Sequence, residues 1–566
     1  MKLALAQRLL PLSFLLLLTP VAAQPAFVDI TPANDPYFVT PAEEDFWLNS
    51  LAPADIDGDG DLDLAAIGYY VVYNVSAEDR LVLFLNQGPD PNGQWTFTNV
   101  LVPLGAVTAG NSDLAWGDYD HDGDEDLAVG SNGATVIFRN DAGTLNVLPN
   151  VLPGYDEDST YSSAYDLRSL SWADYDNDGD LDLLVPSVWN PDTFLFTNAL
   201  LRNDGPDGSG GWIFTDALAA IAPTAQAQST WADDDGDGDL DLLLLNVDQY
   251  LDTSFLKLYR NNNATFSEEP VLDFSELTGL VDWADADADG DLDILVVGNL
   301  LEPDQTYHTV LRIYKNEGGG AFTPILLAEA PTADWLDLHA ATWADYDSDG
   351  DIDVLVTGSY IGPGEIIGHS RIFANNNNVW TALPLELPAP ISSVGRGGAF
   401  TWLDLDGDGD LDYLVGGAYY VPGGNGLVEA KLNLYRNQAS AANQPPAAPA
   451  NLHATPTPAG IQLTWNPALD DHTSTAALTY DLELRPLGAP ASAAKRPPEP
   501  GNLSHTGSWL LENLPPGSYS YSLCAVDSAL NSGAKTGGTF TVGLGPQIFA
   551  NGFESGNTAG WWQTLP

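Results

Sequence analysis

One acidic string occurs seven times in the chain, and this repetition constrains the fold more than any other feature. The string reads Asp-x-Asp-x-Asp-Gly-Asp-x-Asp, opens at intervals of 52 to 63 residues, and varies only at x. Such self-similarity is typical of repeat architectures, in which each copy is one supersecondary unit. We number the copies loop 1 to loop 7 and the residues of each string position 1 to position 9. The opening residues are Asp55, Asp118, Asp174, Asp233, Asp285, Asp345 and Asp404.

Each loop runs directly into a short apolar stretch, such as 64–67 or 294–297. Continuous apolar runs of four or five residues between turn residues predict buried strands, since a helix needs more residues. A second signature of the type Ile137-Phe138-Arg139-Asn140 follows 19 to 30 residues after each opening, and a turn and another short strand come after it. One repeat therefore holds about four strands. Seven four-stranded units predict an all-β fold, a seven-bladed β-propeller.

The two ends of the array indicate that the propeller is closed. The seventh copy reaches Asn437 and enters a linker without its last strand. A matching strand occurs instead near the N-terminus, at 26–31. We predict that this strand completes the last blade, which leaves no open end of the array for edge-to-edge pairing.

The loops have the composition of a binding site for a hard cation. Calcium takes six to eight oxygen ligands, and alternating residues of a tight loop direct their side chains to one point. In loop 1, Asp55, Asp57 and Asp59 are predicted side-chain ligands, Asp61 a ligand through its carbonyl, and Asp63 the residue that closes the shell. Gly60 at position 6 permits the sharp turn.

The prediction of about one calcium per blade covers five aspartates in every loop. The predicted metal ligands are Asp55, Asp57, Asp59, Asp61 and Asp63; Asp118, Asp120, Asp122, Asp124 and Asp126; Asp174, Asp176, Asp178, Asp180 and Asp182; Asp233, Asp235, Asp237, Asp239 and Asp241; Asp285, Asp287, Asp289, Asp291 and Asp293; Asp345, Asp347, Asp349, Asp351 and Asp353; Asp404, Asp406, Asp408, Asp410 and Asp412.

Three other interpretations of the loops are less favoured: an EF-hand, a magnesium site and simple acidic turns. An EF-hand requires a bidentate Glu at position 12, where this chain has Ala66, Val129, Val185, Leu244, Val296, Val356 and Val415. Magnesium keeps several waters and is rarely enclosed by so many protein oxygens. Simple acidic turns would concentrate charge repulsion without compensation. The uniformity of the seven loops favours a structural metal over a catalytic one.

A tryptophan stands two residues before the opening aspartate in six of the copies. Its repetition at one register favours packing between blades, and a stacking platform for sugars is the alternative. These residues are Trp116, Trp172, Trp231, Trp283, Trp343 and Trp402.

With these motifs, the region of residues 25 to 440 resembles the FG-GAP and VCBS-type repeats of integrin-like propellers. The literal Phe-Gly and Gly-Ala-Pro elements that name the family are not evident in this region, so it is more similar to the bacterial type of repeat. The resemblance implies an exported, calcium-binding propeller.

The segments outside the array predict export and a second module. A basic start, an apolar run at 12–18 and small residues at 21–23 are typical of a signal peptide. The strand-like region after the proline-rich linker resembles a fibronectin type III domain, with Trp465 in its core, Tyr519 as a tyrosine corner and Cys524 buried. The predicted organisation is a signal peptide at 1–23, the propeller at 24–440, a linker at 441–450, the fibronectin type III-like domain at 451–543 and a C-terminal tail at 544–566.

Charge and motifs limit the function. A formal net charge of −61 argues against nucleic acid, because phosphates would be repelled. Hypotheses from two classes remain: an extracellular binding or adhesion protein for a protein or glycan, which we favour, and a secreted carbohydrate-active enzyme such as a polysaccharide lyase or hydrolase. The seven histidines are scattered, and no nucleophile motif or phosphate loop occurs. We therefore predict no enzymatic activity, no membrane span, and a secreted or cell-surface location. The oligomeric state is not predicted.

Overall fold

The computed structural model describes most of residues 27–543. Not described are residues 1–26 and 544–566, and internally 34, 39–43, 73–74, 106, 108–111, 132–133, 149–169, 191–194, 218–220, 223, 225–226, 247–254, 270–276, 302–306, 319–320, 331–336, 362–365, 389–399, 421–427, 439–442, 490–502 and 504–506. The predicted signal peptide and the C-terminal tail lie outside the described residues.

The described residues are all β-structure, and 28 of the 34 strands form seven four-stranded antiparallel sheets. In strand order the sheets are β2 (Glu44–Ala54), β3 (Asp63–Val72), β4 (Ser76–Pro89), β5 (Trp95–Val102); β6 (Asp113–Gly117), β7 (Asp126–Ser131), β8 (Ala134–Asn140), β9 (Leu145–Leu148); β10 (Ser171–Ala173), β11 (Asp182–Asn190), β12 (Leu195–Pro206), β13 (Trp212–Asp216); β14 (Ala227–Ala232), β15 (Asp241–Asn246), β16 (Phe255–Asn261), β17 (Phe266–Glu269); β18 (Leu277–Ala284), β19 (Asp293–Leu301), β20 (Tyr307–Asn316), β21 (Phe322–Ala330); β22 (Asp337–Ala344), β23 (Asp353–Ile361), β24 (Ile366–Ala374), β25 (Thr381–Pro388); and β26 (Phe400–Leu403), β27 (Asp412–Tyr420), β28 (Val428–Arg436), β1 (Val28–Asp29).

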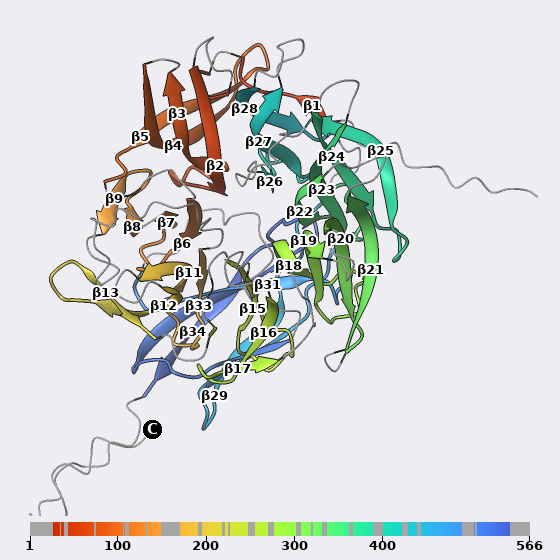
Figure 1. The fold of residues 1–566 in the computed structure, drawn as a ribbon. Coiled ribbons are helices and arrows are strands. Elements are labelled where there is room, and N and C mark those ends of the chain that lie inside the picture. Colours follow the sequence, from red (N-terminus) through yellow and green to blue (C-terminus); the bar gives the residue numbers. More distant parts are fainter. Residues whose placement is uncertain are drawn as a thin grey trace, which may run out of the picture.

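These sheets, which we call blades 1 to 7, stand around a common centre, with the first strand of each toward the middle (Figure 1). The arrangement is that of a β-propeller, as predicted. Each loop joins the first strand of its blade to the second, because position 9 is the first residue of the second strand. The position 12 residues that exclude an EF-hand all lie within these second strands.

The N-terminal strand pairs with the last blade, as predicted. β1 lies antiparallel to β28, with Val28 opposite Arg436 and Asp29 opposite Tyr435. A core cluster then joins the first and last blades, since it includes Leu64 of β3 and Leu434 of β28. The observed strand, Val28–Asp29, is shorter than the predicted 26–31. Residue 26 lies outside the described range.

The remaining strands form a second module of two three-stranded sheets. One sheet has the order β29 (Ala450–Pro456), β30 (Ile461–Asn466) and β32 (Ser508–Leu511), and the other β31 (Thr479–Pro486), β33 (Gly517–Val526) and β34 (Thr536–Val542). Trp465 is buried in its core. The Tyr519 hydroxyl donates a hydrogen bond of 2.8 Å to the Pro515 carbonyl, the contact that defines a tyrosine corner. Cys524 is buried, as predicted.

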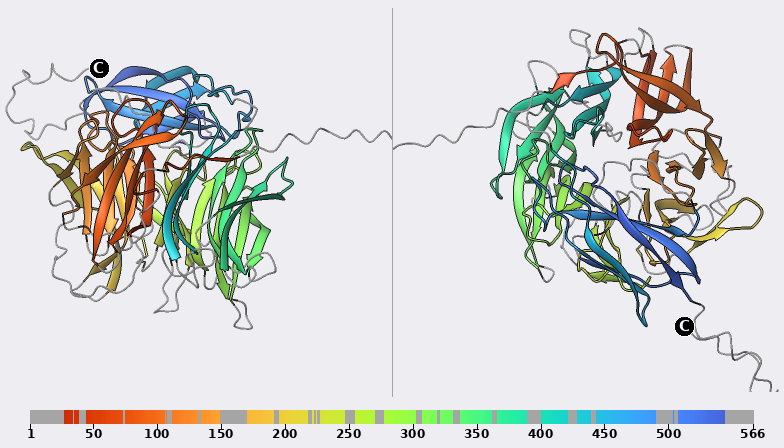
Figure 2. Two further views of the ribbon diagram at one scale, coloured as in Figure 1. Left: turned by 90° about the horizontal axis from the view of Figure 1, so that it is seen from above. Right: turned by 180° about the vertical axis from the view of Figure 1, so that it is seen from behind.

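The second module lies against one end of the ring, rather than apart from it (Figure 2). Its core is continuous with the propeller, because Ala173 and Leu240 belong to the same cluster as Leu463 and Trp509. The sequence predicts two modules separated by a linker, and nothing in it indicates this contact. No helix among the described residues has the length and apolar character needed to cross a membrane.

Candidate functional site: the seven aspartate loops

The seven loops share one backbone conformation. The glycine at position 6 has a φ between 92° and 98° in every loop, a conformation that favours residues without a Cβ. Position 4 is also left-handed in every loop, with φ between 55° and 74°. The predicted role of Gly60 is therefore confirmed, and position 4 is a second left-handed residue that the sequence analysis did not recognise.

Carboxylates at positions 1 and 5 hold this conformation by accepting main-chain hydrogen bonds. In all seven loops, the position 6 N–H donates to the position 1 carboxylate at 2.9 to 3.3 Å. The position 7 N–H donates to the position 5 carboxylate at 3.0 to 3.2 Å. These bonds curl the loop around its acidic side chains.

Position 9 ties each loop to the third strand of its blade. One of its carboxylate oxygens accepts the N–H of the asparagine that ends the second signature, at 2.6 to 2.8 Å in all seven copies. The other oxygen accepts the position 2 N–H in six copies. Position 9 is thus an architectural residue as well as a predicted ligand.

Carboxylate oxygens converge in the loops, which is the arrangement that a cation requires. In loops 1, 3 and 4, positions 1, 3 and 9 each place an oxygen within 4.8 Å of the others, and in loops 2 and 5 positions 1, 3 and 5 do so. At position 3, one oxygen is buried and lacks a hydrogen-bond partner in five loops, at Asp57, Asp176, Asp287, Asp347 and Asp406. A buried carboxylate oxygen without a partner is costly, and an oxygen-seeking cation would satisfy it.

The position 7 side chain faces away from the cluster in three loops. Asp124, Asp239 and Asp351 each accept a main-chain N–H from the hairpin that follows the third strand, at 2.7 to 2.9 Å. The prediction that position 7 contributes its carbonyl to a metal ion stays a prediction. The structure thus brings positions 1 and 3 together with position 9 in loops 1, 3 and 4, and with position 5 in loops 2 and 5.

The electrostatics of the loops oppose full ionisation. Burial, followed by the neighbouring carboxylates, raises the pKa of the position 1 residue Asp118 to about 7. At position 9 burial raises the pKa of Asp63 to about 7, of Asp293 to about 8 and of Asp412 to about 9. Carboxylates held in this way need either protons or a cation at neutral pH.

This gives a pH dependence with a definite sign for the metal-free protein. A carboxyl whose pKa is raised on folding stabilises the fold below its unfolded pKa, near 4, and loses that contribution as pH rises through the folded value. We expect the melting temperature in calcium-free buffer with chelator to fall between pH 5 and pH 9. Thermal unfolding followed by circular dichroism across this range tests it, and a melting temperature that rises with pH would contradict it.

Two kinds of residue in the second signature have roles that the sequence analysis missed. The residue before the asparagine is basic in five copies and pairs with loop carboxylates, as in Lys315 Nζ to Asp287 Oδ2 at 2.6 Å and Arg139 Nε to Asp120 Oδ2 at 3.2 Å. A basic residue recurs at this place in five copies of the second signature, and this recurrence is the feature of the sequence that could have revealed its role.

The asparagine itself links each loop to the preceding one. Its side-chain amide donates to the position 2 carbonyl of the preceding loop in six copies, for example Asn140 to Ile56 at 2.9 Å, whereas Asn316 donates to the position 2 carboxylate of Asp234 at 3.4 Å. Asn86 of blade 1 donates to the Leu405 carbonyl of loop 7 at 3.3 Å, so this chain of contacts passes across the closure of the ring.

The tryptophans pack between blades, as predicted. The Trp116 indole N–H donates to the Ala52 carbonyl of the preceding blade at 3.1 Å, and Trp172 does the same to Ala115 at 3.2 Å. Trp231 donates to the Ser171 hydroxyl at 2.9 Å. These three indole N–H groups therefore hold neighbouring blades together. His121 at position 4 of loop 2 likewise bridges to Asp180 of loop 3 at 2.9 Å.

Comparison with known proteins identifies the repeat. Residues 118–185 and 233–296 match the family described as FG-GAP-like repeat, so the chain carries FG-GAP-like repeats. A comparison with curated proteins finds no match.

Solved structures with a similar arrangement have low sequence identity. They include the extracellular domain of a one-component system from B. thetaiotaomicron, with 7% identity, a TM-score of 0.36 and coverage of 93% of this chain and 59% of that one. The rhamnogalacturonan lyase YesW has 14% identity, a TM-score of 0.34 and coverage of 79% and 76%. The Dos1 propeller has 12% identity, a TM-score of 0.35 and coverage of 76% and 93%.

Proposed function

We propose that this protein is an exported, calcium-binding, seven-bladed β-propeller with a fibronectin type III-like module, and that it acts as an extracellular binding or adhesion protein. The observation that carries the calcium proposal is the common geometry of the loops, with a buried, unpartnered carboxylate oxygen at position 3 in five of them. Oxygen donors alone, in an acidic loop, favour calcium over softer metals. Positions 1, 3, 5 and 9 would hold the ion through side chains and position 7 through its carbonyl.

The calcium proposal predicts a stoichiometry. Because all seven loops share the same backbone and the same hydrogen bonds, we expect the folded protein to bind close to seven calcium ions under saturating conditions. Equilibrium dialysis followed by metal analysis measures the number directly. Two or fewer ions per chain would contradict the assignment of all seven loops.

The role of the ions is structural in this proposal, because every loop is built into the same blade-to-blade network. The binding surface then belongs to the exterior of the propeller or of the second module, and its ligand is a protein or a glycan. An unbiased screen of the full mature chain against glycans and proteins, with and without calcium, tests this. Depolymerisation of a glycan in that screen would support the alternative, a secreted carbohydrate-active enzyme, and refute a purely binding role.

A further inference from the structure

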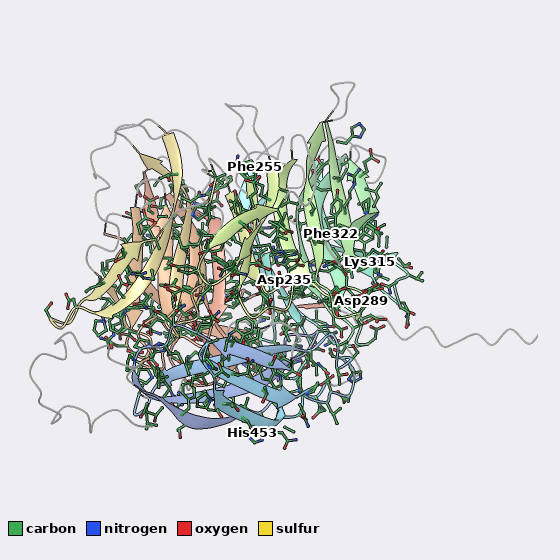
Figure 3. All side chains as sticks on the ribbon, turned by 90° about the horizontal axis from the view of Figure 1, so that it is seen from below. Asp235, Phe255, Asp289, Lys315, Phe322 and His453 are labelled. Atoms are coloured by element: carbon green, nitrogen blue, oxygen red, sulfur yellow. The ribbon has the colours of Figure 1, made fainter. Side chains whose placement is uncertain are left out.

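We propose that the loop face of the propeller is a calcium-dependent docking surface for residues 450–543 of the same chain. The inference rests on the proposed calcium function and adds a partner to it. Figure 3 shows Asp235 of loop 4 and Asp289 of loop 5 at the end of the ring where the second module lies, with Phe255 toward the other end. The module therefore sits on the acidic loops themselves.

The module contacts a predicted metal ligand in loop 6 and the main chain of loop 7. The Ser528 hydroxyl donates to the position 1 carboxylate of Asp345 at 2.8 Å, and the Asp345 N–H donates to the Ser528 carbonyl at 3.2 Å. In loop 7, the Asn531 amide donates to the position 6 carbonyl of Gly409 at 3.0 Å. Ser528 and Asn531 are both buried in this interface.

The contacts to loop 3 combine hydrogen bonds with apolar packing. The Trp509 indole donates to the position 4 side chain of Asn177 at 3.1 Å, and the Asn513 amide donates to the Asp176 carbonyl at 2.7 Å. Leu484 and Leu514 lie so close to Gly179 that a Cβ there would be 2.8 and 3.1 Å from their methyl groups. The interface is thus fitted to the curled conformation of the loop.

In this proposal, the module fits the loops only when calcium is bound to them. The partners of the module are a position 1 carboxylate, a position 3 carbonyl, a position 4 side chain and a position 6 carbonyl, and their relative placement depends on two left-handed residues within a cluster of like charges. The module also adds acids of its own, since Glu512 interacts with the charge of Asp239. Without a cation, repulsion within the loops and across the interface opposes docking.

Loop 1 provides an internal control, because it has the same string without the same surroundings. Residues 58–61 of loop 1 are exposed, and a Cβ at Gly58 or Gly60 would meet nothing within 4 Å. Asp57 and Asp347 occupy the same position in loops 1 and 6, and each has a buried oxygen without a hydrogen-bond partner.

The docked module also forms one wall of a pocket. This pocket has a volume of about 680 Å³ and lies between the first strands of the blades and the module, and its walls include Trp283, Trp343 and Trp402 of the propeller with Asp481 and Leu482 of β31. Release of the module would remove the β31 wall and widen this tryptophan-lined pocket.

The test compares Asp347→Asn with its matched control Asp57→Asn in the full mature chain at saturating calcium. Metal analysis should show about one ion fewer in each variant. Small-angle X-ray scattering should show a larger radius of gyration for Asp347→Asn, because the module is released, and an unchanged one for Asp57→Asn. Circular dichroism verifies that the sheets persist. A double variant, Ser528→Ala with Asn531→Ala, should give the same expansion while all calcium sites remain filled, so the test does not depend on Asp347→Asn folding.

The outcomes separate the two proposals. If the unaltered chain binds calcium at close to seven sites while the radius of gyration is unchanged in Asp347→Asn and in the double variant, calcium-dependent docking is overturned and the calcium function stays intact. Equal expansion of Asp57→Asn and Asp347→Asn also overturns it, because the effect would not be local to the covered loops. No calcium bound by the unaltered chain overturns the proposed function and the docking inference together.

Discussion

Removal of calcium should lower the melting temperature of the propeller by roughly 20 °C. An ion that binds only the folded state at a hundredfold excess over its Kd stabilises by about 2.7 kcal/mol, and seven independent sites would contribute about 19 kcal/mol. An unfolding entropy of about 2.1 cal/mol/K per residue, over a propeller of this size, converts that figure to the expected shift. The effect is large because the ions neutralise the carboxylates whose pKa values burial raises most, such as Asp126, to about 10.

The measurement is thermal unfolding of the full mature chain in calcium and in EGTA at pH 7.5. Magnesium at the same concentration is the control for ionic strength and for divalent charge in general. Equal melting temperatures in calcium and EGTA would refute a structural role for the metal. Recovery in magnesium to the calcium value would refute the preference for calcium.

The propeller could be predicted from sequence because its determinants repeat. Seven copies of one string, followed by strands of constant character, place each position in the same local structure, and the shared left-handed φ of the seven position 6 glycines is the direct result. The closure could also be predicted, since a missing strand at Asn437 and a surplus strand near the N-terminus are complementary. In both cases the information comes from comparing the seven copies of the repeat with one another.

The docking of the second module could not be predicted, because it depends on contacts that occur once. Ser528 and Asp345 are 183 residues apart, and Trp509 and Asn177 are 332 apart. Neither pair repeats, and side chains such as serine and asparagine fit an exposed turn equally well in the sequence. The shapes of the two folded modules determine which residues are in contact at the interface. A periodic sequence pattern carries no information about these contacts.

The candidate metal site lies between these two cases. The clustering of carboxylates was predictable from the string, while the different hydrogen-bonding roles of the five positions were not. Position 9 appeared to be a ligand alone, but its carboxylate also ties the loop to the third strand through hydrogen bonds such as Asn86 N–H to Asp63 at 2.6 Å. That role follows from the three-dimensional proximity of two signatures that lie about 20 residues apart.

A mature chain beginning at Pro32 should be destabilised by several kcal/mol relative to one that keeps β1. The strand contributes the pairing of Val28 and Asp29 with β28, and the Ile30 N–H donates to the Leu434 carbonyl at 2.9 Å. The Thr31 hydroxyl accepts the Leu434 N–H at 2.9 Å. Phe27 packs against the cluster that contains Trp402 and Tyr435, and loss of a packed phenylalanine side chain alone costs about 3–5 kcal/mol when it is fully buried.

Removal of β1 also changes what the ring presents to other molecules. β28 would become an exposed edge strand, and unpaired edges promote association between chains. We therefore expect a lower melting temperature together with concentration-dependent aggregation, measured by thermal unfolding and light scattering. Phe27→Ala should reproduce part of the destabilisation, whereas Val28→Thr, at a side chain that is 37% exposed, should be nearly neutral. If the chain beginning at Pro32 melts at the same temperature as the full mature chain and stays monodisperse, the N-terminal strand does not stabilise the closure of the propeller.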